Sequence, residues 1–317
     1  MWQARHVAER LGQQGIATEL VPLTSRGDTD LRPITAASEV GMFTKRIQQA
    51  LLEDEADVAV HSLKDLPTEP VPDLVLAGIP SRGPAGDCVV WLGEPLKEGL
   101  KGLPAGTRIG TSSRRRVCQL ALAADHCQAL PIRGNLQTRL EKLRSGEYDA
   151  LLLAEAGLER LGLPDVPRYP LATDVMLPAP GQGALAIEVR ADDDQALTWV
   201  STLDDPATRA AVTAERLVLR LLQGGCLAPI AAYATVTPLD GGQEPQEFPA
   251  GFRIDLEVRV LSAEPGHPGV RVSRSATWDG PGHPSDAATA VGRACFDELV
   301  ALGGAELVEQ SRLPGPT

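Results

Sequence analysis

A lysine and an aspartate stand side by side where a short apolar run of the sequence ends. Residues 58–60 predict a buried parallel strand, which leads directly into Ser62, Lys64 and Asp65. Pro67 prevents the strand from continuing. Ligands of open α/β sheets bind beyond the carboxyl ends of the strands. A cation beside a carboxylate at such an edge suits anion binding with acid–base chemistry, whereas the plainer interpretation is a solvated loop with an exposed ion pair.

A second group of polar residues opens a helix. Residues 108–110 predict a strand, and Thr111, Ser113, Arg115 and Arg116 follow in a turn and the start of a helix. Such a helix start presents free backbone N–H groups and the positive end of the helix dipole. Because arginine adds bidentate donors for carboxylate or phosphate, the segment predicts an anion site; the alternative is an exposed basic helix face.

Three further arginines lie at or soon after predicted strand ends, namely Arg133, Arg139 and Arg160. Any one of them alone would be interpreted as a surface residue. Together with Arg115 and Arg116 they predict one electropositive cleft for a ligand that carries several carboxylates.

Cys226 directly follows a Gly-Gly turn at the end of a helix predicted over 207–223. Asp205 is the expected N-cap of this helix, with Pro206 at its first position. Glycines let the backbone approach a ligand closely and leave the sulfur exposed, which favours a covalent attachment role. The alternative is a buried cysteine that acts as a small hydrophobic residue.

The composition is that of an ordinary globular protein, with 43% hydrophobic and 23% charged residues among 317. A net charge of −12 and an aromatic content of 3% argue against nucleic acid or an anionic membrane as partner. The sequence contains no apolar run of about 18 residues that could span a membrane. Five cysteines without CxxC spacing and five scattered histidines predict a reducing cytoplasm and no metal site.

Two segments rich in proline and glycine, 80–84 and 178–183, divide the chain. If both are crossings, the second α/β lobe is an insertion into the first. We therefore expect an α/β fold of two periplasmic-binding-protein-like lobes with mixed sheets, followed by a small C-terminal α+β domain. The expected domains are 1–80 with 182–203, then 85–177, then 204–317.

The beginning of the chain predicts a helix over 2–14 and then a strand over 17–23. The chain would thus begin inside a βαβ unit whose first strand is absent.

Several motifs resemble the porphobilinogen deaminase (hydroxymethylbilane synthase) family. They are residues 60–67 (VHSLKDLP), 110–116 (GTSSRRR), 133–135 (RGN), 178–184 (PAPGQGA), and Glu215-Arg216 followed by residues 224–226 (GGC). The resemblance covers nearly the whole chain with the motifs in the right order, and the set is highly specific.

The resemblance implies a monomeric cytoplasmic transferase of porphyrin and heme biosynthesis. Such an enzyme condenses four porphobilinogen molecules head to tail, with release of ammonia, into the linear tetrapyrrole hydroxymethylbilane. Its cofactor is a dipyrromethane, held by a thioether to the cysteine that corresponds to Cys226. The family's catalytic aspartate matches Asp65. By the same resemblance, Ser62, Lys64, Thr111, Ser113, Arg115 and Arg116 would bind the cofactor, and Arg133, Arg139, Arg160 and Gln182 the substrate and product.

Two departures from the family pattern are visible. The family has a strand and a loop ahead of the helix that begins here at Trp2, with an arginine and a serine that contact cofactor or substrate, so we expect a first lobe without that strand. The family's lid loop reads Gly-Gly-Lys-Gly where residues 38–41 read Ser-Glu-Val-Gly, so the lysine role is unfilled.

The rival hypothesis is a non-catalytic two-lobed protein that binds carboxylates or other anions. The arginines and the hinges would serve it equally well. It needs neither Asp65 beside Lys64 nor Cys226 on a glycine turn, and for that reason we favour the deaminase.

Overall fold

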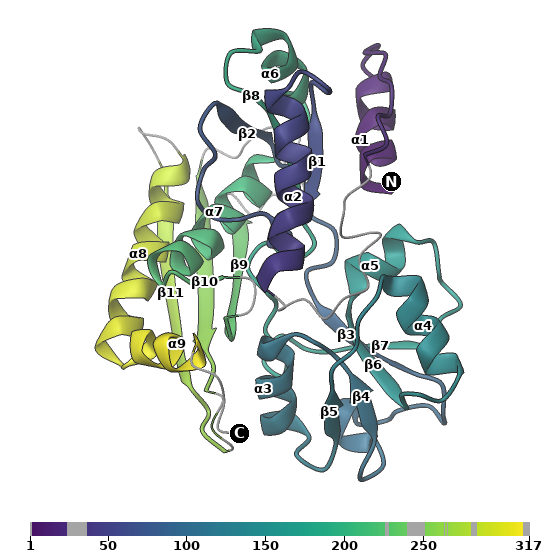
Figure 1. Ribbon diagram of the computed structural model, residues 1–317. Helices are drawn as coiled ribbons and strands as arrows, with labels where there is room; N and C mark the ends of the chain where they lie inside the picture. The colour runs from purple at the N-terminus through teal and green to yellow at the C-terminus, as the bar shows by residue number, and fades with distance from the viewer. Residues whose placement is uncertain are drawn as a thin grey trace.

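The chain folds into three units, each built on its own β-sheet (Figure 1). The structure is a computed structural model and describes residues 2–23, 37–225, 228–239, 251–262, 264, 266–279 and 284–312. We call the units the first lobe, the second lobe and the C-terminal unit. The predicted α/β class, with mixed sheets and a small C-terminal α+β unit, is confirmed.

The first lobe contains a three-stranded sheet in the order β1-β8-β2. Its elements are α1 (Trp2–Gly12), α2 (Ala37–Leu52), β1 (Ala59–Ser62), the 3-10 turn η2 (Leu63–Asp65), β2 (Leu74–Gly78), β8 (Leu185–Arg190) and α6 (Asp194–Ser201). Helix α2 therefore already includes residues 38–41, where the family has its lid loop.

Two expectations for this lobe were wrong. The strand β1 pairs with β8 in antiparallel register, Val60 opposite Ile187, and not with a parallel neighbour. An apolar run in the sequence indicates that a strand is buried, but it does not indicate the direction of the strand relative to its neighbour. The antiparallel direction of β1 follows from the way the chain returns into β8. Residues 17–23 form no strand; they are exposed or half-buried and join no ladder among the described strands.

The second lobe contains a five-stranded mixed sheet in the order β5-β4-β6-β3-β7. Strand β4 runs parallel to β5 and β6, whereas β3 runs antiparallel to β6 and β7. The elements are β3 (Asp87–Trp91), η3 (Gly99–Gly102), β4 (Arg108–Gly110), α3 (Arg114–Ala123), β5 (Gln128–Leu130), α4 (Leu136–Arg144), β6 (Ala150–Ala154), α5 (Glu155–Arg160) and β7 (Arg168–Pro170).

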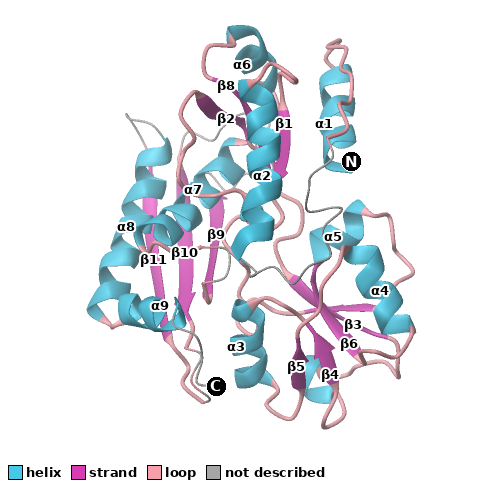
Figure 2. Cartoon of the chain, in the orientation of Figure 1, coloured by secondary structure: helices cyan, strands magenta, loops and turns pink. Residues whose placement is uncertain are grey.

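The C-terminal unit packs helices against a three-stranded antiparallel sheet in the order β11-β10-β9 (Figure 2). Its elements are α7 (Pro206–Leu221), β9 (Ile230–Pro238), β10 (Phe252–Val260), β11 (Val270–Trp278), α8 (Pro284–Ala301) and α9 (Gly304–Arg312). Alternate residues of β10 from Phe252 to Val260 are fully buried, as the period-2 pattern predicts.

Local capping rules hold where the sequence predicts them. The side chain of Asn135 accepts a hydrogen bond from the N–H of Thr138 and caps α4. The side chain of Asp205 accepts from the N–H of Thr208 and caps α7, with Pro206 next in the chain.

None of the helices in the described ranges is long and apolar enough to cross a membrane.

The two lobes are joined by two chain segments that lie side by side. The first leads from β2 into β3, and the second leads back into β8. The N–H of Gly83 donates to the carbonyl of Gly183 at 3.2 Å, which binds one segment to the other. Gly183 has a φ of +89°, and a Cβ at this position would lie 2.6 Å from the carbonyl oxygen of Gly83.

We expect Gly183→Ala to lower the free energy of unfolding by about 2–5 kcal/mol, because it adds left-handed strain and a clash with backbone atoms that cannot rotate away. Gly106→Ala is the matched control, since Gly106 has a φ of +79° with nothing within 4 Å of the added Cβ. It should cost about 1–2 kcal/mol from strain alone. Urea unfolding of the two variants measures the difference, and equal losses would contradict a tight crossing.

Candidate active site

The Lys64–Asp65 pair lies on the single turn η2 that follows strand β1. Lys64 is half-buried, and its Nζ lies 3.4 Å from Oε1 of Gln182, which comes from the second crossing segment. Burial lowers the pKa of Lys64 to about 8, and the charge of Asp65 opposes this shift. Repulsion from Arg116 and Arg115 lowers the same pKa further, and the charge of Asp87 raises it. Two guanidiniums and two carboxylates therefore act on one ammonium group.

A cleft of about 640 Å³ separates the two lobes beside this turn. Ser62 and Lys64 line it from the first lobe, and Arg160 lines it from the second. The volume lies within the range of small-molecule sites in proteins. Of the five arginines predicted to form one electropositive cleft, Arg160 lines this one, where it is joined by Lys64. The residues described as lining it do not include Arg115, Arg116, Arg133 or Arg139.

Helix α1 and the second crossing close one side of the cleft. Gln3 donates from Nε2 to Oγ of Ser62 at 2.6 Å, and the ring of Trp2 lies 6.0 Å from the guanidinium of Arg160. Arg160 also donates to the carbonyl of Gly183 at 2.8 Å. Burial lowers the pKa of Arg160 and the nearby carboxylate of Asp65 opposes that shift, so the two side chains are electrostatic neighbours.

A buried carboxylate lies behind the cleft. Asp87, the first residue of β3, has no exposed surface, and its two oxygens each lie 2.6 Å from a guanidinium nitrogen, one of Arg115 and one of Arg116. Gln182 donates from Nε2 to the same carboxylate at 3.0 Å. The amide oxygen Oε1 of Gln182 accepts from Lys64, so a chain of polar contacts runs from Lys64 to Asp87.

Charge balance decides the protonation of this cluster. Burial alone would raise the pKa of Asp87, but the charges and hydrogen bonds of Arg115 and Arg116 hold it well below its ordinary value. The carboxylate is therefore ionised at neutral pH. The two guanidiniums of Arg115 and Arg116 against the one carboxylate of Asp87 leave one positive charge in excess. In addition, Nε of Arg115 is buried without a hydrogen-bond partner among the described residues. This orphaned donor points to an anion as the remaining partner.

The start of helix α3 is close to these arginines. Thr111 is buried, and its Oγ1 accepts a hydrogen bond from the N–H of Ser113. Ser113 is the N-cap residue of α3, but its side chain makes no capping hydrogen bond. The start of α3, where the sequence predicts an anion site, therefore has no side-chain cap from Ser113.

The remaining arginines spread the positive charge over the second lobe. Burial lowers the pKa of Arg139, and repulsion from Arg116 lowers it further, which indicates that the two guanidiniums are neighbours. Nε of Arg139 donates to the carbonyl of Gly134 at 2.8 Å. Arg133 lies just before this glycine in the loop that leads to α4.

The crossing segments are also tied to the C-terminal unit. Glu215 of α7 is fully buried and lies 2.7 Å from a guanidinium nitrogen of Arg82. Its carboxylate also accepts from the N–H groups of Gly181 and Ala234. Four chain segments therefore meet at one carboxylate.

Contacts or charge connect Lys64 with Asp65, Arg115, Arg116 and Gln182, connect Arg139 with Arg116, and connect Arg160 with Asp65. Cys226 lies outside the described residues, and α7 leads toward it as far as Gly225. Sequence reasoning missed Asp87, Arg82 and the buried role of Glu215. The signal for Asp87 was an acidic residue at the head of the apolar segment 87–91, which can be buried only with cationic partners.

We expect Asp87→Asn to lower the free energy of unfolding by about 3–5 kcal/mol, because it leaves two buried guanidiniums without their counter-charge. Asp149→Asn is the control, since the Arg108–Asp149 pair is more than a third exposed and should contribute about 0–1 kcal/mol. Urea unfolding at neutral pH separates the two variants. Similar small losses in both would show that the buried cluster does not stabilise the crossing.

Comparisons with known proteins converge on one family. Residues 1–198 match "Porphobilinogen deaminase, dipyromethane cofactor binding domain", and residues 209–263 match "Porphobilinogen deaminase, C-terminal domain". The porphobilinogen deaminase of Thermobifida fusca is 41% identical over 310 residues, covering 96% of this chain and 91% of the relative. That of Xanthomonas campestris pv. campestris is 40% identical over 313 residues, covering 98% and 95%.

Solved structures give weaker likenesses. An ancestral cationic amino acid solute-binding protein matches with a TM-score of 0.39 and 13% identity over 63% of this chain and 76% of its own. A putative methionine-binding lipoprotein from Bacillus subtilis matches with a TM-score of 0.38 and 13% identity over 63% and 83%. Scores at this level bear on neither the fold nor the function of this chain.

The sequence relatives span nearly the full length of the chain, and both parts of it match the same family. This chain belongs to the porphobilinogen deaminase family.

Proposed function

We propose that this chain is a hydroxymethylbilane synthase, which condenses four porphobilinogen molecules head to tail with release of ammonia. The observation that carries the proposal is the Lys64–Asp65 turn beside a cleft lined by cations, in a chain of the porphobilinogen deaminase family. A protein that only binds anions remains the alternative, but no observation favours it over the family match.

Asp65 is assigned the catalytic role. Each porphobilinogen loses ammonia from its aminomethyl carbon, which leaves positive charge spread onto the pyrrole nitrogen. A carboxylate beside that nitrogen stabilises the charge and accepts a proton when the new carbon–carbon bond is complete. Asp65 suits this role because the charges of Lys64 and Arg160 lie near its carboxyl group, at the edge of the cleft.

A dipyrromethane fits the donors of this chain. It carries four carboxylates, and the orphaned Nε of Arg115, the free start of α3 and the ammonium of Lys64 are donors without enough internal acceptors. Its thioether is assigned to Cys226. The residues proposed to hold its carboxylates are Ser62, Lys64, Thr111, Ser113, Arg115 and Arg116. When bound, it supplies the free pyrrole α-carbon from which the product chain grows.

The growing product needs further cations, since every added ring brings two more carboxylates. Arg133, Arg139 and Arg160 are proposed to bind them, and Gln182 is proposed to contact the substrate from the second crossing. Repulsion between Arg139 and Arg116 supports this assignment, because a carboxylate placed between two guanidiniums relieves it.

The three sheets with their separate apolar clusters support the domain bounds 1–80 with 182–203, 85–177 and 204–317.

We further propose a cytoplasmic monomer. The reducing compartment is supported by the free thiols of the described residues, namely Cys88, Cys118, Cys127 and Cys295.

The pH dependence of kcat/KM should report the charge of Lys64 in the free enzyme. Because burial lowers the pKa of Lys64 to about 8, the ammonium is charged below that pH and loses its proton above it. Weaker carboxylate binding should then lower kcat/KM about tenfold between pH 7 and pH 9. Lys64→Arg keeps its charge over this range and should give a flat profile at a lower level. A flat wild-type profile would exclude a role for this charge.

Intact-mass measurement tests the function itself. The wild-type chain should carry the added mass of two linked pyrrole units and should turn over porphobilinogen. Cys226→Ala should lose both the added mass and the activity, because the thioether can no longer form. A folded wild-type chain of bare mass would contradict the proposal.

Asp65→Asn is the informative second variant in the same experiment. The amide keeps the shape of the side chain but cannot stabilise positive charge or accept a proton. The added mass should remain while kcat falls by about 10²–10⁴. Near-normal turnover in this variant would remove Asp65 from the catalytic role.

A further inference from the structure

The turn that carries Lys64 and Asp65 is held from behind by an arginine of the C-terminal unit. Arg216 of α7 donates from Nη1 to the carbonyls of Leu63 and Leu66 at 3.0 and 2.9 Å. It donates from Nη2 to the carbonyl of Pro67 at 2.7 Å. One guanidinium therefore binds the backbone on both sides of the Lys64–Asp65 pair.

This turn has one backbone hydrogen bond of its own among the described residues, which is too few to fix its conformation. Within η2 and its C-cap the N–H of Leu66 donates to the carbonyl of Leu63 at 3.2 Å, and Pro67 has no N–H to offer. The carbonyls of Leu66 and Pro67 thus depend on donors from elsewhere in the chain. Arginine suits the task because its planar fork presents several donors in fixed directions, whereas a lysine presents one compact point charge.

The same helix leads to the proposed cofactor cysteine. Helix α7 ends at Leu221, five residues after Arg216, and the described chain continues through Gly224 and Gly225 toward Cys226. The buried carboxylate of Glu215 fixes the helix beside Arg216. Because the helix is rigid, it fixes the position of the Asp65 turn relative to the start of the segment that bears the proposed cofactor cysteine.

We propose that Arg216 is a positioning residue, which sets the distance between the Asp65 carboxylate and the pyrrole rings held through Cys226. The proposal rests on the proposed function. Arg216 acts through the backbone of the turn and touches no reacting atom itself.

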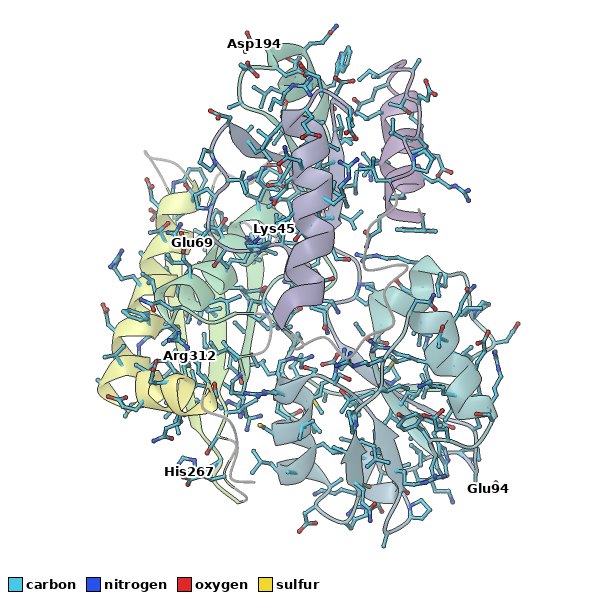
Figure 3. The ribbon with its side chains drawn as sticks, viewed as in Figure 1. Lys45, Glu69, Glu94, Asp194, His267 and Arg312 are labelled. Carbon is cyan, nitrogen blue, oxygen red and sulfur yellow. The ribbon has the colours of Figure 1, made fainter. Side chains whose placement is uncertain are left out.

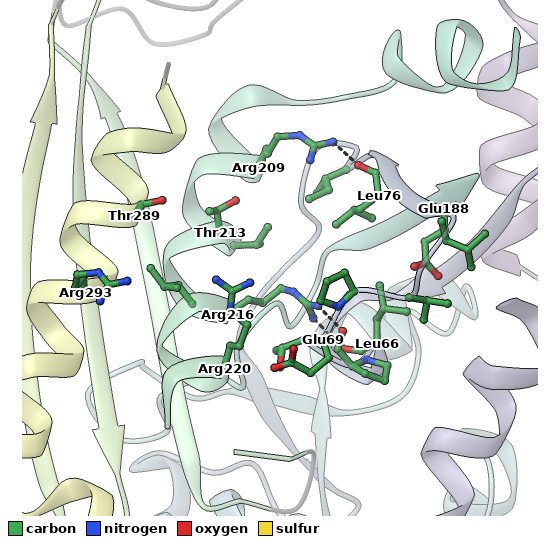
Figure 4. Close-up of a pocket in the computed structure, with 18 residues that line it drawn as sticks. Leu66, Glu69, Leu76, Glu188, Arg209, Thr213, Arg216, Arg220, Thr289 and Arg293 are labelled. Atoms are coloured by element: carbon green, nitrogen blue, oxygen red, sulfur yellow. Dashed lines mark hydrogen bonds between the residues drawn. The ribbon is translucent and has the colours of Figure 1, made fainter. Parts of the chain in front are cut away.

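Figure 4 shows the surroundings of this contact, with the Arg216 guanidinium directed toward the Leu66 segment. Arg216 lines a pocket of about 310 Å³ between the first lobe and the C-terminal unit. Arg220 lines the same pocket one helical turn later on α7 and is exposed. Among the described residues no hydrogen bond or ion pair is found for the Arg220 side chain, so it offers a control of the same charge, helix and pocket.

The test compares Arg216→Ala with Arg220→Ala in the full-length holoenzyme. In Arg216→Ala we expect the added cofactor mass to remain and kcat to fall about ten- to a hundredfold, since a small displacement of a catalytic group is costly. KM should change less than about threefold, because the substrate-binding cations are untouched. Arg220→Ala should behave as wild type.

Chemical rescue separates positioning from a loss of folding. Deleting the guanidinium leaves space at the edge of an open pocket, so added methylguanidinium should restore part of the turnover of Arg216→Ala. It should not restore Asp65→Asn. Arg216→Lys keeps the charge but cannot reach three carbonyls at once, and it should give an intermediate kcat. If Arg216→Ala does not fold, the kcat of Arg216→Lys tests the proposal instead. A kcat equal to that of the wild type in Arg216→Lys would overturn the proposal.

Hydrogen exchange gives a readout independent of turnover. The amide of Leu66 should exchange at least about tenfold faster in Arg216→Ala than in wild type, while the amides of β10 keep their protection. If the wild-type chain fails to turn over, the proposed function fails and exchange at Leu66 still decides whether Arg216 holds the turn. Unchanged exchange, unchanged kcat, or a loss of kcat that methylguanidinium leaves unaltered would each overturn the proposal.

Discussion

The buried carboxylate of Asp87 and its two guanidinium partners are the interaction on which the arrangement of the lobes depends. A charge without solvent must be matched by an opposite charge within hydrogen-bond distance, so Asp87, Arg115 and Arg116 can be buried only together. Asp87 begins the first strand after one crossing, and Gln182 joins it from the other. Both crossings and the start of helix α3 are therefore fixed at one point, directly behind the cleft.

The electrostatics of the cleft contrast with those of the chain as a whole. The protein carries a net charge of −12, and acidic side chains such as Glu94 and Asp194 lie at the outer edges of the two lobes (Figure 3). Around Lys64, by contrast, repulsion from Arg115 and Arg116 contributes to lowering the pKa of the ammonium group. A polyanion is repelled by a surface of this net charge and attracted by the cations Lys64 and Arg160 at the cleft.

Helix α7 connects the parts that must act together. Its residue Glu215 binds the crossing through Arg82, and the next residue, Arg216, binds the turn of Lys64 and Asp65. These neighbouring side chains point to different units because successive residues on a helix lie about 100° apart. The amphipathic helix thus serves as a common frame for the crossing segments, the Lys64–Asp65 turn and the segment that leads toward Cys226.

Local rules made much of this structure predictable from the sequence. The caps at Asn135 and Asp205 and the alternation along β10 follow from contacts between residues close in the chain. The Lys64–Asp65 turn was predictable too, because Pro67 ends the strand that precedes it. The positions of the arginines after strands predicted one electropositive cleft, and the structure brings Arg160 and Lys64 to it. The roles that the family resemblance implies for the arginines stay predictions.

Tertiary structure decided what depends on distant partners. The direction of β1 follows from the return of β8, and residues 17–23 form no strand because no described strand lies beside them to accept their hydrogen bonds. Sequence alone could not pair Asp87 with its arginines or Arg216 with the carbonyls of the Lys64–Asp65 turn. Those contacts join residues up to 153 positions apart, and a pairwise charge or hydrogen bond across such a separation leaves no periodic pattern in the chain.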